Sequence, residues 1–338
     1  MSFAMKTVWI VSEGSPGHIS QSVGLVNALK ECCDLRVVEV FGRVTVRGWL
    51  RHCLRFLMTK SGRALPGFLL KRTHKVEMPD DAPAPDLIVS SGGKSVIASR
   101  TWAQIFNVPY VFVGERKPYP STWFHTIISP VERESCENSI DVELIPTPVT
   151  PQFIVEKGEI EKDIWCMIIG GASRSHRFEE KDWIGIAEGM NVLAERENIR
   201  WLITTSRRTG AEAEAVLKKN LNPDVLKDAI WWADAPRREL YSFMARSEVL
   251  FVTQDSVTMV TEAISSGKPV VGIRPQHLDF PTNSFLPSYF NRLEMNRRIL
   301  VVFTRNMDEF SLVKADFCLQ KGNVFKPVAV ELVKRLGW

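Results

Sequence analysis

Four loops of the sequence combine glycine with hydroxyl and charged residues, and each follows a short apolar run. They are Gly14-Ser15-Pro16-Gly17-His18, Ser90-Ser91-Gly92-Gly93-Lys94-Ser95, Gly170-Gly171-Ala172-Ser173-Arg174 and Thr204-Thr205-Ser206-Arg207-Arg208-Thr209-Gly210. Glycine lets the backbone approach a phosphate closely, and a helix N-terminus behind such a loop offers free N–H groups. None of the four matches GxGxxG or the P-loop spacing, so any one alone is better explained as a plain turn. Together they predict a phosphate-bearing ligand.

A longer stretch, residues 251–277, carries a more specific pattern. A strand ends at Thr253, the polar residues Gln254, Asp255 and Ser256 turn the chain, and a predicted helix carries Glu262 before Gly267-Lys268-Pro269. Such a turn can present N–H groups to a phosphate, and the carboxylate can bind a pair of ribose hydroxyls. The alternative is that Ser256 is an ordinary N-cap and that Glu262 lies on the surface.

Strands and helices alternate along the whole chain, which predicts an α/β fold with doubly wound sheets. Most of the predicted strands are short, continuous and β-branched, as buried parallel strands are. The expected strands are Thr7–Val11, Leu35–Val40, Leu87–Val89, Tyr110–Val113, Thr126–Ile128, Trp165–Ile169, Trp201–Thr204, Ala229–Trp232, Val249–Val252, Val270–Ile273 and Leu300–Phe303. The expected helices are Gln21–Cys32, Ser95–Phe106, Trp183–Glu197, Glu212–Leu221, Arg237–Ala245 and Thr258–Ser266. In parallel sheets ligands bind at the carboxyl ends of strands, where the four loops lie.

The length of 338 residues favours two domains. A proline-rich, strand-poor stretch, Ile145–Lys162, is expected to link them, giving Rossmann-like domains over 1–150 and 151–338. A last helix, Val324–Gly337, is assigned to the second domain, with packing back on the first left open.

The composition limits the class of protein. The net charge is +4 and the six cysteines form no CxxC, which predicts a cytoplasmic chain with reduced thiols, no zinc site and no nucleic-acid partner. No secretory signal and no apolar run long enough to cross a bilayer are apparent. The histidines show no i, i+4 pairing and no Asp-x-Asp ends a strand, so no metal is expected.

One segment departs from this composition, since Arg43–Lys75 contains nine Lys and Arg and no acidic residue. Four arginines, Arg43, Arg47, Arg51 and Arg55, recur at i, i+4 spacing and are predicted to share one helical face beside Trp49. A basic stripe beside Trp and Leu is typical of a helix lying on an anionic membrane surface. A core helix with a basic outer face is an equally good alternative.

Residues 252–269 resemble the donor-site segment of GT-B glycosyltransferases, such as the N-acetylglucosaminyltransferase of peptidoglycan lipid II. The chain as a whole is more similar to bacterial members of the "elongated mitochondria" fission-protein family, regarded as glycosyltransferases. "SEGSPGH", "GGASR", "TTSRRTG" and "QDSVTMVTEA…GKPV" carry this similarity in that order and span most of the sequence.

The resemblance implies a GT-B architecture, with a nucleotide sugar bound by the second domain as substrate and no cofactor. The implied donor-binding residues are Gly170, Gly171, Ser173, Arg174, Ser206, Arg207, Thr209, Trp232, Asp255, Ser256, Thr258, Met259 and Glu262. Asp255 departs from the lipid II enzyme, where a small neutral residue is expected, because an acid beside a diphosphate repels it unless it contacts a sugar hydroxyl. Trp231 and Trp232 end a strand where such enzymes hold the base, and one of them is expected in the core.

The same resemblance assigns the acceptor to the first domain, at Gly14, Ser15, Gly17, Gly92, Gly93 and Lys94. His18 then corresponds to the residue that faces the donor, and imidazole titrates near neutral pH, which suits removal of a proton from an acceptor hydroxyl. The alternative is that His18 only caps the helix or orients a phosphate, and Glu13 and Glu115 are rival bases.

The expected function is transfer of a sugar from a nucleotide-sugar donor to a membrane- or envelope-associated glycan or lipid-linked acceptor. Arg47, Trp49, Arg51 and Arg55 would contact the anionic inner face of the cytoplasmic membrane. Two alternatives stay open: a non-catalytic membrane-associated adaptor on the same fold, and a nucleotide-sugar epimerase.

Overall fold

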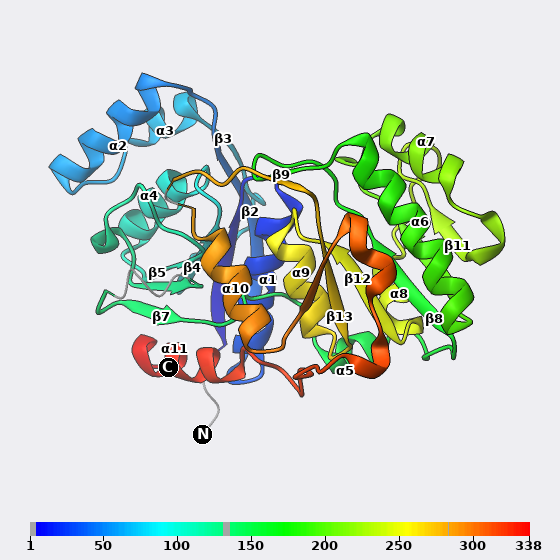
Figure 1. The fold of residues 1–338 in the computed structure, drawn as a ribbon. Coiled ribbons are helices and arrows are strands. Elements are labelled where there is room, and N and C mark those ends of the chain that lie inside the picture. The colour runs from blue at the N-terminus through cyan, green and yellow to red at the C-terminus, as the bar shows by residue number, and fades with distance from the viewer. Residues whose placement is uncertain (1–4, 131–135, 283) are drawn as a thin grey trace. The chain divides into compact units, whose positions relative to one another are not determined.

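The computed structural model describes residues 5–130, 136–282 and 284–338 and divides the chain into two compact units (Figure 1). The first unit runs up to Pro148 and takes in Val324–Trp338, and the second is Val149–Asn323. The last helix, α11 (Lys326–Leu336), therefore belongs to the first unit. The predicted linker contains a helix, α5 (Pro151–Val155), whose first turn Thr150 caps by accepting a hydrogen bond from the Phe153 N–H (3.1 Å).

The first unit is built on a seven-stranded sheet in the order β3-β2-β1-β4-β5-β6-β7, parallel except for β2 against β3. The strands are β1 (Lys6–Ser12), β2 (Leu35–Val44), β3 (His74–Glu77), β4 (Leu87–Ser91), β5 (Tyr110–Val113), β6 (Thr126–Ser129) and β7 (Ser139–Asp141). The helices are α1 (Pro16–Lys30), α2 (Trp49–Ser61), α3 (Gly67–Thr73) and α4 (Val96–Phe106), with α11 packed on α1 and a short 3-10 helix η1 at Ser121–Trp123. The strand order reverses between β1 and β4, which is the switch point where open α/β sheets bind ligands.

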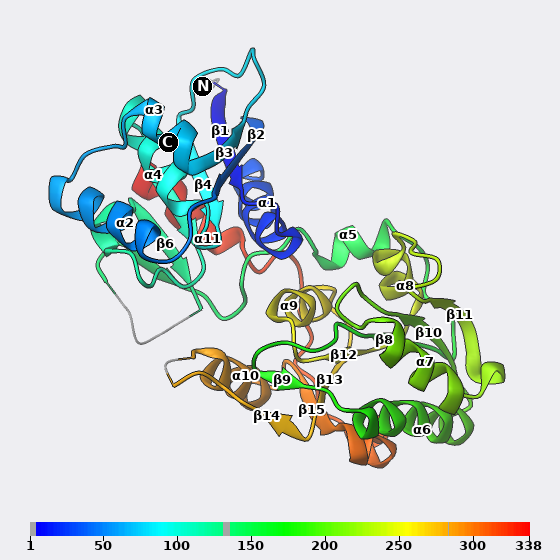
Figure 2. The same cartoon turned by 90° about the horizontal axis from the view of Figure 1, so that it is seen from above.

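The second unit repeats this plan with a six-stranded, all-parallel sheet in the order β11-β10-β8-β12-β13-β15 (Figure 2). Its strands are β8 (Ile164–Ile168), β10 (Arg200–Thr204), β11 (Leu226–Ile230), β12 (Val249–Thr253), β13 (Val270–Arg274) and β15 (Leu300–Phe303), beside a small antiparallel pair, β9 (His176–Arg177) with β14 (His277–Leu278). Its helices are α6 (Glu180–Glu197), α7 (Ala211–Asn220), α8 (Leu240–Arg246), α9 (Val257–Ser265) and α10 (Leu286–Met295), after α5. Here the switch point lies between β8 and β12.

Each unit has an aromatic-rich core that fixes its sheet. Trp9 and Tyr110 are fully buried in the first unit, and Trp165, Trp201 and Phe251 pack against one another in the second, with ring centroids 5.1–5.7 Å apart. Continuous burial on both faces explains why β4, β5, β6, β8 and β12 read as unbroken apolar runs. The predicted α/β class with doubly wound sheets is confirmed.

All eleven predicted strands are present. One of them is shifted along the chain, and one predicted helix begins earlier than expected. The strand predicted at 229–232 spans 226–230, so Trp231 and Trp232 follow it. Helix α1 begins at Pro16, inside the predicted glycine turn, because proline suits the first helical position, and His18 therefore lies in the first turn of the helix.

The predicted basic helical stripe is wrong. Arg43 lies in β2 opposite Lys75 of β3, and Arg47 precedes α2, which begins only after Gly48. Of the four arginines only Arg51 and Arg55 are helical, and Arg51 donates hydrogen bonds to the Gly93 carbonyl (2.6 Å) and the Tyr119 hydroxyl (3.1 Å). Arg51 is thus turned onto the body of the first unit. No helix among the described residues is long and apolar enough to cross a bilayer.

Candidate functional site

The loops after β1 and β4 bring a histidine and a carboxylate together at the switch point of the first unit. Glu13 follows β1 directly, and its carboxylate lies 3.0 Å from Nδ1 of His18. Its second oxygen accepts the backbone N–H of Lys94 from the β4 loop (2.6 Å). The Glu13 side chain is only 6% exposed, whereas the His18 side chain is 39% exposed. A buried carboxylate therefore holds an imidazole that reaches solvent.

Gly92 makes this close approach possible. Its φ of +84° favours glycine, and a Cβ there would lie 2.2 Å from Nδ1 of His18 and 2.8 Å from the Glu13 carboxyl carbon. The Ser95 hydroxyl holds the loop by donating to the Gly92 carbonyl (2.9 Å). Gly92, which was predicted to contact a ligand, is thus also needed to pack the loop against His18 and the Glu13 carboxylate.

The hydrogen bond between these two side chains fixes how the imidazole presents its nitrogens. Burial by itself raises the pKa of Glu13, but the hydrogen bond and charge of His18, together with the Lys94 N–H, lower it below its usual value. An ionised carboxylate can only accept, so Nδ1 of a neutral His18 carries the hydrogen and Nε2 keeps its lone pair. The arrangement suits a general base at Nε2.

The other residues predicted in the first unit lie on the same loops and serve partly internal contacts. The Gly14 N–H donates to the Ser12 hydroxyl (3.0 Å), Ser15 is the N-cap of α1 without a side-chain cap, and Gly17 is in its first turn. The Gly93 carbonyl accepts from Tyr119 (2.7 Å) as well as from Arg51, and the Lys94 carbonyl accepts the Val44 N–H (3.0 Å). Glu115, the rival base, lies two residues beyond β5 and is half-buried. The carboxylate in contact with His18 is that of Glu13.

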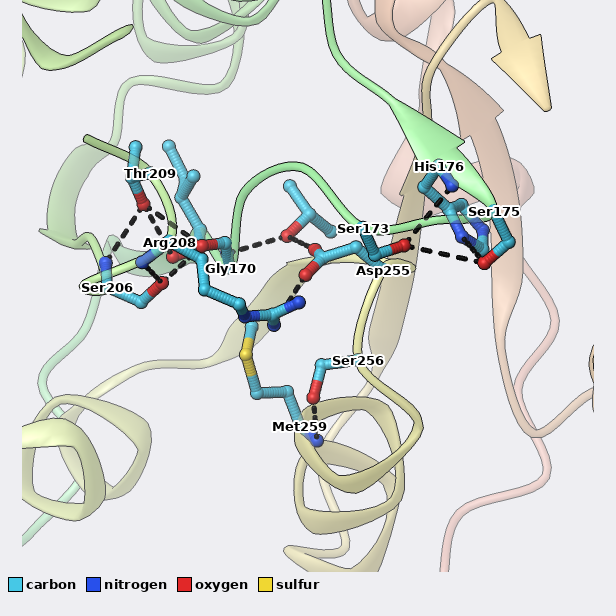
Figure 3. A network of polar contacts seen from close by, with 12 residues as sticks. Gly170, Ser173, Ser175, His176, Ser206, Arg208, Thr209, Asp255, Ser256 and Met259 are labelled. Atoms are coloured by element: carbon cyan, nitrogen blue, oxygen red, sulfur yellow. Dashed lines mark hydrogen bonds and ion pairs between the residues drawn. The ribbon is translucent and has the colours of Figure 1, made fainter. Parts of the chain in front are cut away.

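In the second unit the loops after β8, β10 and β12 converge on Gly170 and Asp255. The Gly170 N–H donates to the Thr253 hydroxyl (2.8 Å), which in turn donates to the Asp255 carboxylate (2.6 Å). Figure 3 shows the guanidinium of Arg208 reaching the same carboxylate, with Nη2 2.6 Å from Oδ2. This contact is an ion pair whose geometry is not that of a hydrogen bond, so Oδ2 keeps accepting capacity.

Two of the predicted hydroxyls shape the β10 loop around Gly170. Ser206 and Thr209 both donate to the Gly170 carbonyl, the latter over 3.1 Å (Figure 3). A Cβ on Gly170 would lie 2.4 Å from the Asp255 carboxylate, so only glycine admits the acid at this point. The loops thus fit closely around Asp255.

The Asp255 side chain is 0% exposed, and this burial raises its pKa to about 6 although Arg208 and the Thr253 hydroxyl oppose the shift. The Arg208 side chain is 40% exposed, whereas the Asp255 carboxylate beside it is buried. The guanidinium is therefore the cation of this site that an incoming anion can reach.

Helix α9 begins beside these loops, and its first turn offers backbone N–H groups. Ser256 is its N-cap and accepts the Met259 N–H (3.4 Å) (Figure 3). Thr258 lies in the first turn of the helix. Glu262 is buried one turn further on and accepts a hydrogen bond from the Tyr241 hydroxyl of α8 (3.4 Å). The alternative that Glu262 lies on the surface is therefore wrong. Burial and the Glu262 charge raise the pKa of Tyr241, which keeps its hydroxyl protonated as a donor.

Some predicted donor residues lie apart from this cluster. Ser173 turns toward Ser175 and His176, whereas Arg174 and Arg207 are exposed and make no polar contact with another described residue. The sequence named Arg207, but its neighbour Arg208 is the arginine at the site. Gly171 packs against the backbone of Arg208 and Thr209.

The loop after β11 is held by residues that the sequence analysis missed. Thr205 accepts the Trp232 N–H (2.8 Å) and donates to Glu214 (2.6 Å), which also accepts the Ala233 N–H (3.2 Å). Trp232 itself is 41% exposed, while Trp231 packs against the core, in line with the expectation that one tryptophan is internal. Glu214 carried no motif, and only its burial on α7 reveals its role.

Comparison with known proteins gives the family. A family model described as "Mitochondrial fission ELM1" matches residues 16–301. An uncharacterized protein of Rickettsia prowazekii is 25% identical over 177 residues, 48% of each chain, and mitochondrial fission protein ELM1 of Arabidopsis thaliana is 34% identical over 105 residues, 30% of this chain and 23% of that protein. The matches thus span about half of the first relative and a quarter of the second.

Solved structures share the fold at low identity. The UDP-GlcNAc 2-epimerase from Methanocaldococcus jannaschii is 12% identical, with a TM-score of 0.56 over 98% of this chain and 100% of that one. The UDP-GlcNAc 2-epimerase from Neisseria meningitidis bound to UDP-GlcNAc is 14% identical, with a TM-score of 0.52 over the same shares. CalG4, the calicheamicin glycosyltransferase, is 12% identical, with a TM-score of 0.50 over 99% of each chain. The expected GT-B architecture is confirmed at the level of fold, and the chain belongs to the mitochondrial fission ELM1 family.

Proposed function

We propose that the protein is a metal-independent glycosyltransferase that moves a sugar from a nucleotide-sugar donor to an acceptor hydroxyl on a membrane- or envelope-associated glycan or lipid. The observation that carries the proposal is the pair of His18 and Glu13 at the β1–β4 switch point. A buried carboxylate that orients a solvent-facing imidazole is an arrangement for proton transfer. A protein that only binds has no need of it.

The donor is proposed to bind at the second unit's switch point. Its diphosphate would contact the Arg208 guanidinium and the positive N-terminal end of α9, and both would stabilise the leaving group without a resident metal. The loop that ends in Trp232 is the proposed base contact, and Glu262 the proposed ribose contact.

Asp255 has a place in this scheme because its Oδ2 has accepting capacity left. Once the diphosphate draws Arg208 away, the carboxylate can accept a hydrogen bond from a sugar hydroxyl. We infer that Asp255 contacts the donor sugar and not the phosphates.

The proposed step is a single displacement at the anomeric carbon. Nε2 of His18 takes the proton of the acceptor hydroxyl, the acceptor oxygen forms the new bond to the anomeric carbon, and the bond to the diphosphate oxygen breaks with its electron pair leaving on the nucleoside diphosphate. Glu13 stabilises the imidazolium that forms and keeps its orientation.

The test is an incubation of the full chain with labelled nucleotide sugars, with and without a bacterial membrane extract. Transfer is supported if nucleoside diphosphate release and label in the glycan or lipid fraction both depend on the extract. Conversion of the sugar to its epimer without extract would instead identify an epimerase. No consumption of any donor, in a chain that binds the extract, would identify a non-catalytic adaptor.

A further inference from the structure

Helices α2 and α3, with the residues that flank them, form a part of the first unit whose positive charges lack acidic partners. Arg47, Arg55, Lys60, Arg63, Lys71 and Arg72 make no ion pair with any residue in the described ranges. No acidic residue occurs between Arg43 and Lys75 to supply one locally. Unlike the paired charges of the second unit, these cations are available to an external anion.

The same two helices expose large apolar side chains. Leu54 and Met58 of α2 bury one side in the core, yet on the other side Trp49 is 72%, Phe56 60% and Leu57 56% exposed, and Phe68 of α3 is 69% exposed. Figure 1 shows both helices at an outer edge of the first unit. An apolar face beside unpaired cations suits the interface of an anionic bilayer, because the rings enter the headgroup region while the cations meet lipid phosphates.

A cavity of about 210 Å³ opens between α2, α4 and η1. Its walls include Arg63 just beyond α2, Arg100 and Gln104 of α4, and the hydroxyl-bearing residues Thr59 and Thr122. The volume is several times the roughly 30 Å³ that one water occupies in the liquid, so a phosphate group with a short substituent fits.

The chemistry of the walls is one-sided. Arg100 forms no ion pair with any residue in the described ranges. Burial lowers its pKa, and the group that opposes this shift is the Tyr110 side chain, not a carboxylate. Gln104 donates from Nε2 to the Gly62 carbonyl (2.6 Å), which leaves its buried Oε1 facing no donor among the described residues. Two cations for a phosphate are thus present together.

We propose that the α2–α3 face docks on an anionic phospholipid bilayer, and that the cavity holds one lipid headgroup with its phosphate between Arg63 and Arg100. Phosphatidylglycerol has this chemistry. The inference sharpens the membrane side of the proposed function, but it does not depend on the transferase step. A free phosphate would explain the arginines, but it leaves the exposed rings of Trp49, Phe56 and Phe68 without a role.

The test is sedimentation of the full chain with vesicles of phosphatidylcholine alone and of phosphatidylcholine with phosphatidylglycerol. Arg63→Gln/Arg100→Gln should weaken binding to the mixed vesicles about 30-fold, from about 1 kcal/mol per surface cation and 1.4 kcal/mol per factor of ten. Trp49→Ala/Phe56→Ala should abolish it. Lys30→Gln/Arg36→Gln removes the same charge from exposed positions elsewhere in the unit and should cost less than threefold. If Arg100→Gln lowers the melting temperature, the single variant Arg63→Gln replaces the double variant in this test.

Three results would overturn the proposal. Equal losses in the Arg63/Arg100 and Lys30/Arg36 variants would mean that net charge acts without a headgroup site. If Trp49→Ala/Phe56→Ala bound the vesicles as tightly as the wild type, the apolar face would have no role in docking. Stabilisation by inorganic phosphate that Arg63→Gln abolishes, with no vesicle binding, would assign the cavity to a soluble anion. None of these readouts involves sugar transfer, so failure here is distinct from failure of the proposed function.

Discussion

Each unit places a carboxylate at its switch point, and the pKa values of the two carboxylates shift in opposite directions. Glu13 follows the first strand of its unit and Asp255 follows the strand across the switch point in the other. Both are buried, but His18 and the Lys94 N–H lower the pKa of Glu13, while burial raises that of Asp255 to about 6 despite Arg208. The cost of burying the charged form outweighs the contacts that stabilise it at Asp255, whose side chain is 0% exposed, but not at Glu13, whose side chain is 6% exposed.

The contrast assigns different roles to two similar side chains. An ionised Glu13 can orient and stabilise a base, whereas Asp255, with a raised pKa and an ion pair to a partly exposed arginine, can exchange that arginine for a ligand. In the proposed mechanism the first site is therefore preorganised for proton transfer, and the second rearranges when the donor binds.

His18→Ala should produce the largest effect, because it removes the proposed base. We expect transfer to fall by roughly 10²–10⁴-fold while the donor dissociation constant is unchanged. The measurement is kcat and donor affinity side by side, with the exposed His277→Asn as the control that should stay at wild-type activity. An active His18→Ala variant would leave the first site without its proposed role.

Glu13→Gln keeps the size and the Lys94 contact but removes the charge that faces His18. We expect kcat to fall on the order of a hundredfold, with donor affinity unchanged, because the imidazolium loses its stabilising partner. Since the folded-state pKa of Glu13 lies below its usual value, its contribution to stability is present above that usual value and is lost as pH falls through the lowered pKa. Acid unfolding of Glu13→Gln should lack this component, and Glu39→Gln on an exposed strand position is the control.

Arg208→Gln tests the second site, and its neighbour supplies the matched control. Losing a charge-assisted contact to the diphosphate should weaken nucleotide binding by roughly 10–100-fold, whereas Arg207→Gln should change it less than threefold. Calorimetric titration of both variants with one nucleoside diphosphate measures this. Equal losses in the two would show that general charge, and not the Arg208 position, attracts the nucleotide.

Asp255→Asn should have the smallest effect, and its sign is opposite to that of the others. At pH 7.5 the ionised acid competes with the diphosphate for Arg208, so the variant should bind a nucleotide sugar roughly three- to tenfold more tightly. Wild-type binding should tighten as pH falls through about 6, where Asp255 protonates, and the variant should lack this dependence. The binding should be measured with a nucleotide sugar and in the His18→Ala background. The diphosphate of a nucleotide sugar does not titrate in this pH range, and the inactive variant does not consume the ligand.

The same pKa predicts a stability effect. A folded-state pKa raised from 3.8 to about 6 means that the folded chain holds this proton more tightly, so stability should fall as pH rises from about 4 to about 6. Thermal melts of Asp255→Asn should be flatter over that interval.

The sequence predicts the sheets and the loops because both follow from local pattern. Continuous β-branched runs mark buried parallel strands, and a glycine loop after each marks the ligand edge. Which side chain of a loop reaches the site depends on its three-dimensional turn. Ser206 and Thr209 fold the β10 loop so that Arg208 meets Asp255 and Arg207 does not, and nothing in "SRRT" distinguishes them.

The predicted helical stripe of four arginines was wrong for a related reason. The i, i+4 spacing of four arginines runs through the end of β2 and through Gly48 before α2 begins, so the spacing has no single helix beneath it. The contact of Glu13 with His18 was also hidden, since it depends on α1 starting at Pro16 and on Gly92 leaving room. Residues that act through tertiary contacts, such as Glu214 under the β11 loop, carry no sequence signal at all.

The most direct measurement is calorimetric titration of the full chain with UDP, GDP, ADP, CMP and dTDP in parallel with thermal melts. Donor binding in the second unit predicts saturable 1:1 binding of one nucleotide, with a raised melting temperature that Glu262→Ala and Arg208→Gln reduce and Arg207→Gln does not. No heat and no shift with any nucleotide, in a chain that melts cooperatively, would contradict a nucleotide-sugar transferase. The α2–α3 face would then be the remaining basis for its function.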